Sequence, residues 1–158
     1  MSEDHLKAIT LWQPWASAMA AEMKRNETRS WRTDYRGPLL IHAAARRPTE
    51  CDLWVLEHPA VKLRLALDNI DPKKFPLGAA VCIVKLVDCV RVETIRDTLS
   101  PMELALGNYN NGRYAWITEF LHYIDKPIPM KGAQGFWNCD MGYFCGEDES
   151  PIAALDGL

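Results

Sequence analysis

The sequence predicts an α+β fold, a mainly antiparallel sheet that curls into a β-barrel with flanking helices on one side. Three observations support this prediction. Strand-like segments outnumber helical ones, in the order strand, helix, two strands, helix and then several strands. Apolar residues make up 48% of the 158 residues, enough for one well-buried core in a chain too short for two ordinary domains. Curling the sheet closed would also remove its exposed edges.

The first third of the chain is predicted to form a strand, a helix and two further strands. Leu6–Trp12 has strand character, and Pro14 suits a first helical turn because it has no N–H to leave unpaired. Apolar residues recur at three- and four-residue spacing over Trp15–Met23, which predicts an amphipathic helix. Strands are expected at Asn26–Trp31 and, after a turn, at Leu39–Ala43.

The middle third is predicted to be helical first and extended afterwards. Pro48–Asn69 favours helix, with an interruption at His58 because a residue before proline disfavours the helical conformation. Gly78–Val92 is the longest strand-like stretch, and its early apolar residues occupy both parities. A strand of this kind is buried on both faces, or lies in a barrel wall that helices cover.

The last third begins with a short predicted helix at Ser100–Leu106. Ser100 and Glu103 have the spacing of a capping box at its start. The segment Gly107–Gly112 is expected to be a flexible connector. The remaining strands are predicted at Tyr114–Tyr123 and Phe136–Cys139.

The chain is expected to be one domain over residues 1–158, with a core at about 6–139 and an acidic tail at 140–158. Its start lacks the basic and long apolar segments of a secretion signal, and no apolar run is long enough to span a bilayer. The five cysteines form no C-x-x-C pair, which favours reduced thiols. These features predict a cytoplasmic protein with no membrane partner.

Charge is distributed unevenly along the chain despite a net charge of −3. Residues 24–47 hold seven basic and two acidic side chains, a local net charge of +5. Such a stripe can attract phosphate locally, but it is too small for a protein that coats long nucleic acid. The alternative interpretation is a solvated basic face.

Aromatic residues are concentrated in the same part of the chain. Trp12, Trp15, Trp31 and Tyr35 alternate with Arg and Lys rather than with leucine. Indole faces stack on nucleobases, each stack contributing roughly 1–3 kcal/mol. The alternative, strongest for Trp12, is that these rings belong to the core.

Strand parity predicts a pocket wall. In an extended Asn26–Trp31 segment, Glu27, Arg29 and Trp31 point to one face. An acid, a guanidinium and an indole make a poor core but a good binding wall, on which Arg29 holds Glu27 in its charged form. Lys24 ends the preceding helix, within reach of the same opening. The alternative is a surface ion pair beside a tryptophan anchor.

These residues resemble the ASCH domain, a member of the PUA-like superfamily. The resemblance lies in three motifs, QPWA at 13–16, K-x-x-E-x-RSW at 24–31 and RG at 36–37, and in a late GAQGFW segment at 132–137. It implies a PUA-like β-barrel in which Lys24 and Glu27 face a cleft between barrel and helices. Relatives include a bacterial amidohydrolase that deacylates N4 of cytidine, a single-strand ribonuclease and modules that only bind nucleic acid.

The sequence departs from the family pattern at two positions. Glu22 stands where a glycine is usual, and Glu27 stands where the compact amidohydrolase has its threonine nucleophile. Thr28 is adjacent, but strand parity turns it away from the Glu27 face. A threonine mechanism therefore does not transfer directly to this chain.

The first functional hypothesis is an amidohydrolase acting on N4-acylated cytosine nucleosides. The base would stack on Trp15 or Trp31, Glu27 would act as general base on water, and Lys24 would donate to the oxyanion. Further substrate-binding candidates are Gln13, Arg29, Tyr35 and Arg36. No metal or other cofactor is expected, and His42 is interpreted as a satisfied core histidine.

The second hypothesis is a module that binds single-stranded RNA or DNA, or a ribonuclease, using the same cleft with the basic stripe on phosphates. A nuclease would need Lys24 or Tyr35 to protonate the leaving oxygen. A third is a protein-interaction domain, which leaves the face formed by Glu27, Arg29 and Trp31 unexplained.

Overall fold

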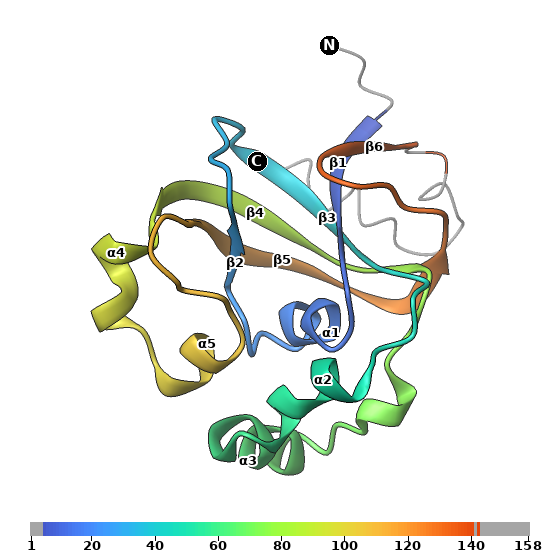
Figure 1. Ribbon diagram of the computed structural model, residues 1–158. Helices are drawn as coiled ribbons and strands as arrows, with labels where there is room; N and C mark the ends of the chain where they lie inside the picture. The colour runs from blue at the N-terminus through green and yellow to red at the C-terminus, as the bar shows by residue number, and fades with distance from the viewer. Residues whose placement is uncertain (1–4, 141, 143–158) are drawn as a thin grey trace.

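The computed structural model describes residues 5–140 and 142, and its centre is a six-stranded sheet (Figure 1). The strands lie in the order β2-β5-β4-β3-β1-β6. Of the described pairs, β1 with β3 is parallel and the others are antiparallel. The predicted α+β class is therefore confirmed. The strands are β1 (His5–Leu11), β2 (Asn26–Arg29), β3 (Gly37–Ala43), β4 (Ala79–Arg91), β5 (Tyr114–Pro129) and β6 (Trp137–Asp140).

The sheet curves but does not close into a barrel within the described residues. β2 and β6 are its edges and do not pair with each other. Each edge strand has only four residues. Short edges offer few unpaired backbone groups to another chain, so this sheet protects its edges without the closure that the sequence predicted.

The helices are short (Figure 1). The predicted break at His58 is confirmed, since this residue has extended backbone angles between a 3-10 helix and a new α-helix. A short helix after β4 was not predicted. The helices are α1 (Trp15–Ala20), α2 (Glu50–Leu53), η1 (Trp54–Glu57), α3 (Pro59–Leu67), η2 (Pro72–Lys74), α4 (Val92–Ile95), η3 (Arg96–Thr98) and α5 (Pro101–Ala105). Most of the α-helices, α1, α2, α3 and α5, gather on one side of the sheet, whereas α4 lies at the end of β4.

The central strands bury both faces. Leu39 and Ile41 of β3 pack in one apolar cluster with Met19 of α1, whereas Leu40 packs in a second cluster on the opposite face. β4 contributes buried residues to both clusters, as its two-parity apolar pattern predicts. α1 thus covers one face of the sheet, and a third cluster joins it to α3 and α5.

The turn after α1 sets the position of Lys24. The helix ends at Ala20 rather than at the predicted Met23, and Glu22 has a φ of 58°. The backbone N–H groups of Met23 and Lys24 then both donate to the carbonyl of Ala18. This closes the turn tightly and directs the chain into β2. Glycine adopts this left-handed conformation without strain, which agrees with the glycine that the family resemblance led us to expect at the position of Glu22.

Two further expectations concern the connector and the tail. Tyr109, in the middle of the connector predicted to be flexible, is buried in a cluster with Val92 and Ala115. The connector is therefore anchored to the domain. The predicted acidic tail lies outside the described residues, apart from positions 140 and 142. Within the described part of the chain, no helix is long and apolar enough to cross a membrane.

Candidate functional site

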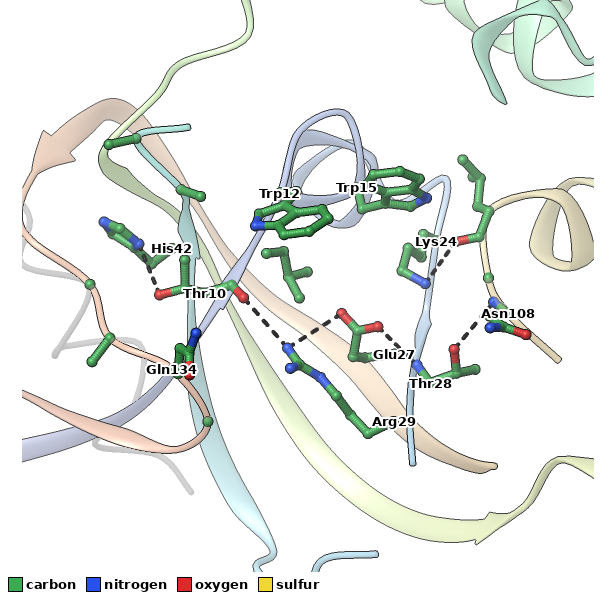
Figure 2. Close-up of a pocket in the computed structure, with 18 of the residues that line it drawn as sticks. Thr10, Trp12, Trp15, Lys24, Glu27, Thr28, Arg29, His42, Asn108 and Gln134 are labelled. Carbon is green, nitrogen blue, oxygen red and sulfur yellow. Dashed lines mark hydrogen bonds and ion pairs between the residues drawn. The ribbon is translucent and has the colours of Figure 1, made fainter. Parts of the chain in front are cut away.

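A cavity of about 1070 Å³ opens between the sheet and the helices (Figure 2). Its walls come from the carboxyl ends of β1 and β3, from β2, from the connector after α5 and from the loop before β6. Lys24, Glu27, Arg29, Trp15 and Trp31 all line it. The structure therefore brings the predicted catalytic pair and three of the predicted binding residues together.

Lys24 is a buried cation on the cavity wall. Only 2% of the residue is exposed, and its Nζ donates to the carbonyl oxygen of Leu106 at 2.9 Å. A lysine ammonium has three donors, so this bond holds the side chain in place and leaves donors for a ligand. In Figure 2 the Lys24 side chain lies between Trp15 and Glu27, and the dashed line marks its bond to that carbonyl.

Glu27 and Arg29 project from the same face of β2, as strand parity predicts. The carboxylate of Glu27 accepts a hydrogen bond from the N–H of Thr28 at 2.9 Å. Nη2 of Arg29 lies 4.0 Å from the other carboxylate oxygen and 3.5 Å from the carbonyl oxygen of Thr10. Nε of Arg29 is buried with no hydrogen-bond partner in the described structure. Arg29 thus spans from Glu27 to β1 across the cavity floor.

The tryptophans supply flat apolar surface around these charges. Trp15 and Trp31 line the cavity, although β2 ends at Arg29 and Trp31 lies beyond it. The Trp31 ring is fixed edge-on against Trp116, with ring centroids 4.6 Å apart. Trp12 also lines the cavity and is 52% exposed, so the alternative that it belongs to the core is wrong.

Three predicted binding residues do not line the cavity. Gln13 is 1% exposed, and its amide is engaged by Ser17 and by the carbonyl oxygen of Pro76. Tyr35 donates its hydroxyl to the carbonyl oxygen of Pro38 at 2.6 Å, and burial raises its pKa. Arg36 donates to two backbone carbonyls and lies 3.7 Å from Asp88. All three are engaged in local structure, and the structure does not bring them into this cavity with Lys24 and Glu27, as had been predicted.

His42 is a satisfied histidine on the cavity wall. Its Nε2 lies 2.8 Å from the carbonyl oxygen of Met130, and its Nδ1 lies 3.1 Å from Oγ1 of Thr10. Burial lowers its pKa, so the ring is neutral, with the proton on Nε2 and Nδ1 accepting from Thr10. Nε1 of Trp137 donates to the same Thr10 oxygen at 3.1 Å. Within residues 5–140 and 142, no group of three or more His, Cys, Asp or Glu could hold a metal ion.

The connector and the residue that follows it also contribute to the site, which the sequence did not predict. Asn108 and Arg113 line the cavity and both donate hydrogen bonds to Thr28. Thr28 belongs to the same lining, but its side chain is directed toward Asn108 and away from Glu27 (Figure 2). The N–H of Asn108 donates to Oγ1 of Thr28 at 3.2 Å, and Nη2 of Arg113 donates to the Thr28 carbonyl oxygen at 3.0 Å. The polar residues on the opposite face of β2, Asn26 and Thr28, could have indicated that another segment packs there.

Glu103 lies near Lys24, and its role differs from the predicted one in the capping box of the helix at Ser100–Leu106. Ser100 caps α5 by accepting from the N–H of Glu103, but the carboxylate accepts from the N–H of Arg25 at 2.8 Å. The predicted capping box is therefore only half formed. Burial raises the pKa of Glu103, against the opposing effect of neighbouring backbone donors and of Lys24. This carboxyl group supports the turn that carries Lys24.

A family model for the ASCH domain matches residues 9–128, which include the whole of the Lys24–Glu27 region. The chain therefore belongs to the ASCH domain family, within the PUA-like superfamily. ASCH domains are associated with RNA binding, so the family indicates a function related to RNA.

Two curated relatives resemble this chain, "Activating signal cointegrator 1" of Homo sapiens and of Mus musculus. Each is 26% identical over 132 residues, which cover 84% of this chain and 22% of the relative. The chain thus spans about a fifth of the length of these relatives and corresponds to one part of them.

Proposed function

We propose that this ASCH domain is an amidohydrolase that removes acyl groups from N4 of cytosine in nucleosides or RNA. The observation that carries the proposal is the position of Lys24 and Glu27 on one cavity wall, beside Arg29 and two indole rings. A buried ammonium and a carboxylate supply the two groups that amide hydrolysis requires, a donor to the oxyanion and a base for water.

We expect the indole rings of the cavity to position the cytosine ring of the substrate. A cytosine ring stacked on Trp15 or Trp31 would direct its N4 acyl group toward the charged wall. Arg29 spans the floor between Glu27 and β1, so it limits how far the carboxylate can turn. Holding the reacting atoms at close range is a large part of catalysis.

The reaction begins with water attacking the acyl carbon. Glu27 accepts the proton as the new C–O bond forms, and Lys24 donates a hydrogen bond to the carbonyl oxygen as it becomes negative. When the tetrahedral intermediate collapses, the bond between the acyl carbon and N4 breaks. Glu27 returns its proton to N4, which leaves cytosine with its amino group and releases the acyl group as a carboxylic acid.

The test is incubation with N4-acetylcytidine, measured by its ultraviolet conversion to cytidine, for the parent chain and for two variants. Lys24→Ala and Glu27→Gln are each expected to lower turnover by about 10²-fold or more, the loss typical of an oxyanion donor or a general base. Glu27→Gln keeps the shape of the side chain, so its melting temperature should match that of the parent. If Glu27→Gln left turnover unchanged, Glu27 would not be the general base.

A second candidate function is binding of single-stranded RNA without turnover. It is favoured by Trp12, which presents a half-exposed indole at the cavity with the guanidinium of Arg46 over its ring and by the association of the family with RNA. Recovery of bound, acetylated RNA unchanged after prolonged incubation would favour this candidate over the hydrolase.

A further inference from the structure

We propose that Trp12 and Arg46 form a second nucleotide subsite beside the pocket for the reacting base. The site then binds a single-stranded polynucleotide more tightly than it binds a free nucleoside. This inference rests on the proposed function for the position of the first base, and it names the substrate class. It concerns residues that the catalytic proposal does not use.

The parallel pairing of β1 and β3 creates this subsite. Leu11 and Ala43 are partners in the register, so the two strands end at the same edge of the sheet. The N–H of Ala44 donates to the carbonyl oxygen of Leu11 at 2.9 Å and extends the pairing by one step. Trp12 follows β1 and Arg46 follows β3, so the two side chains meet at the carboxyl ends of the strands.

Arg46 is held over the indole before any ligand binds. Its Cζ lies 3.8 Å from the centroid of the Trp12 ring, and its Nη1 donates to Oδ2 of Asp52 at 2.7 Å. That oxygen also accepts from the N–H and the hydroxyl of Thr49, at 2.7 and 3.0 Å. A guanidinium fixed by a buried carboxylate keeps the indole in one orientation, and such preorganisation lowers the cost of binding.

Trp12 remains available to a ligand despite this contact. The residue is 52% exposed and contributes to the cavity lining. Figure 2 shows its ring next to that of Trp15, over the space that holds Glu27 and Arg29. One indole of the pair can stack on the reacting base while the other stacks on its neighbour in the strand.

Cavity size and charge agree with a ligand longer than one nucleoside. The volume of about 1070 Å³ lies just above the usual range of about 300–1,000 Å³ for pockets that hold drug-sized molecules, which are larger than a nucleoside. The charged residues of the lining are one acid, Glu27, and four bases. Two of these bases, Arg113 and Lys131, lie outside the catalytic group and can neutralise the phosphates that join successive nucleotides.

The test compares two RNA trinucleotides with a central, unacetylated cytidine. One carries bases on both flanking nucleotides and the other is abasic at both, so the phosphates are the same and only stacking differs. Isothermal titration calorimetry on the parent chain should give a Kd at least about 10-fold lower for the ligand with flanking bases. The same ligands built from deoxyribonucleotides identify which of the two polymers the subsite prefers.

Variants assign the effect to the proposed residues. Trp12→Ala should reduce the difference between the two ligands to less than about 2-fold, and Arg46→Lys should reduce it in part, because lysine lacks the planar group that stacks. Trp54→Ala is the matched control, since Trp54 is 75% exposed on η1 and does not contribute to the cavity lining. It should preserve the difference.

Two results would overturn the subsite. One is equal affinity of the parent chain for both trinucleotides. The other is an equal loss of affinity for both ligands in Trp12→Ala, which would place Trp12 on the central base. Neither measurement depends on turnover, because the ligands carry no acyl group. The subsite is therefore tested independently of the amidohydrolase activity.

Discussion

Burial controls the protonation of His42, and this gives a pH dependence that can be measured. Its pKa is lowered from 6.5, chiefly because the ring is removed from water, although the bond to the Met130 carbonyl opposes the shift. Below pH 6.5 the unfolded chain therefore binds a proton at this position that the native chain does not. The contribution of His42 to stability is present above pH 6.5 and is lost as the pH falls toward the native pKa.

We accordingly expect the free energy of unfolding of the parent chain to fall more steeply between about pH 6.5 and 5 than that of His42→Gln. Glutamine can donate and accept hydrogen bonds at a similar position but does not titrate. Urea unfolding at a series of pH values measures both slopes. Identical slopes would show that His42 does not resist protonation in the native state.

The backbone at Gly132 lies so close to the side chains of Thr10 and His42 that only glycine fits there. A Cβ at this position would lie 2.4 Å from Oγ1 of Thr10 and 2.6 Å from Nδ1 of His42. Both atoms belong to a hydrogen-bonded group that cannot move without losing partners. We expect Gly132→Ala to lower the free energy of unfolding by about 1–3 kcal/mol, the usual cost of overpacking.

The neighbouring Ala133 gives a control, because it is exposed in the same loop. Ala133→Ser should leave the unfolding midpoint in urea within error of the parent. Equal midpoints for Gly132→Ala and Ala133→Ser would mean that the loop before β6 moves away freely. In that case it would not be a fixed wall of the cavity.

At the scale of the elements, the end of α1 carries a conformational cost. Glu22 has a φ of 58°, which costs a residue other than glycine roughly 1–2 kcal/mol. Glycine removes this cost but loses more entropy on folding, by about 0.5–1 kcal/mol. Glu22→Gly is therefore expected to raise the free energy of unfolding by about 0.5–1 kcal/mol, as measured by urea denaturation.

Asn69 provides the comparison, since its φ of 53° is similar but asparagine tolerates this region better. Asn69→Gly should give a smaller gain than Glu22→Gly. A loss of stability in Glu22→Gly would show that the left-handed conformation of Glu22 carries no such cost.

Local patterns predicted the elements well, and long-range contacts decided where prediction failed. Parity placed Glu27 and Arg29 on the same face of β2 because both lie within one regular strand. Gln13 was assigned by its neighbours in sequence, but its amide bonds to Pro76, 63 positions away. No pattern along the chain identifies such a partner. The same reason hid the contact of Asn108 with Thr28.

At the scale of the whole molecule, a net charge of −3 contrasts with a cavity whose lining is basic. Attraction of phosphates is therefore local and limited to a few groups. We expect the affinity for a short single-stranded RNA to fall on the order of 10-fold between 50 and 200 mM salt, as about three neutralised phosphates imply. Turnover of the uncharged nucleoside N4-acetylcytidine should change less than about 2-fold over the same range.

Salt titrations of binding and of turnover measure the two responses separately. If turnover of the free nucleoside fell as steeply as RNA binding, salt ions would be acting on the charged groups of the cavity themselves. A fixed hydrogen bond from Lys24 would then not explain the activity.

The fold class could be predicted from the sequence, but the closure of the sheet into a barrel could not. The α+β class and the buried central strands follow from periodicity, whereas closure depends on whether the two edge strands meet. β2 and β6 are four residues each and remain apart in the described structure. The turns that precede these two strands contact residues distant in sequence, Leu106 in the case of Lys24 and His42 in the case of Gly132, and periodicity does not reveal such partners.

The central claim is that Lys24 and Glu27 act on an acyl group held in one cavity. A crystal structure of Glu27→Gln with N4-acetylcytidine tests it most directly, because this variant should bind the substrate without converting it. We predict that the cytosine ring stacks on Trp15 or Trp31, with the acyl oxygen within hydrogen-bond distance of Nζ of Lys24. A nucleoside bound outside the cavity, or bound within it with the acyl group directed away from Lys24, would contradict the account.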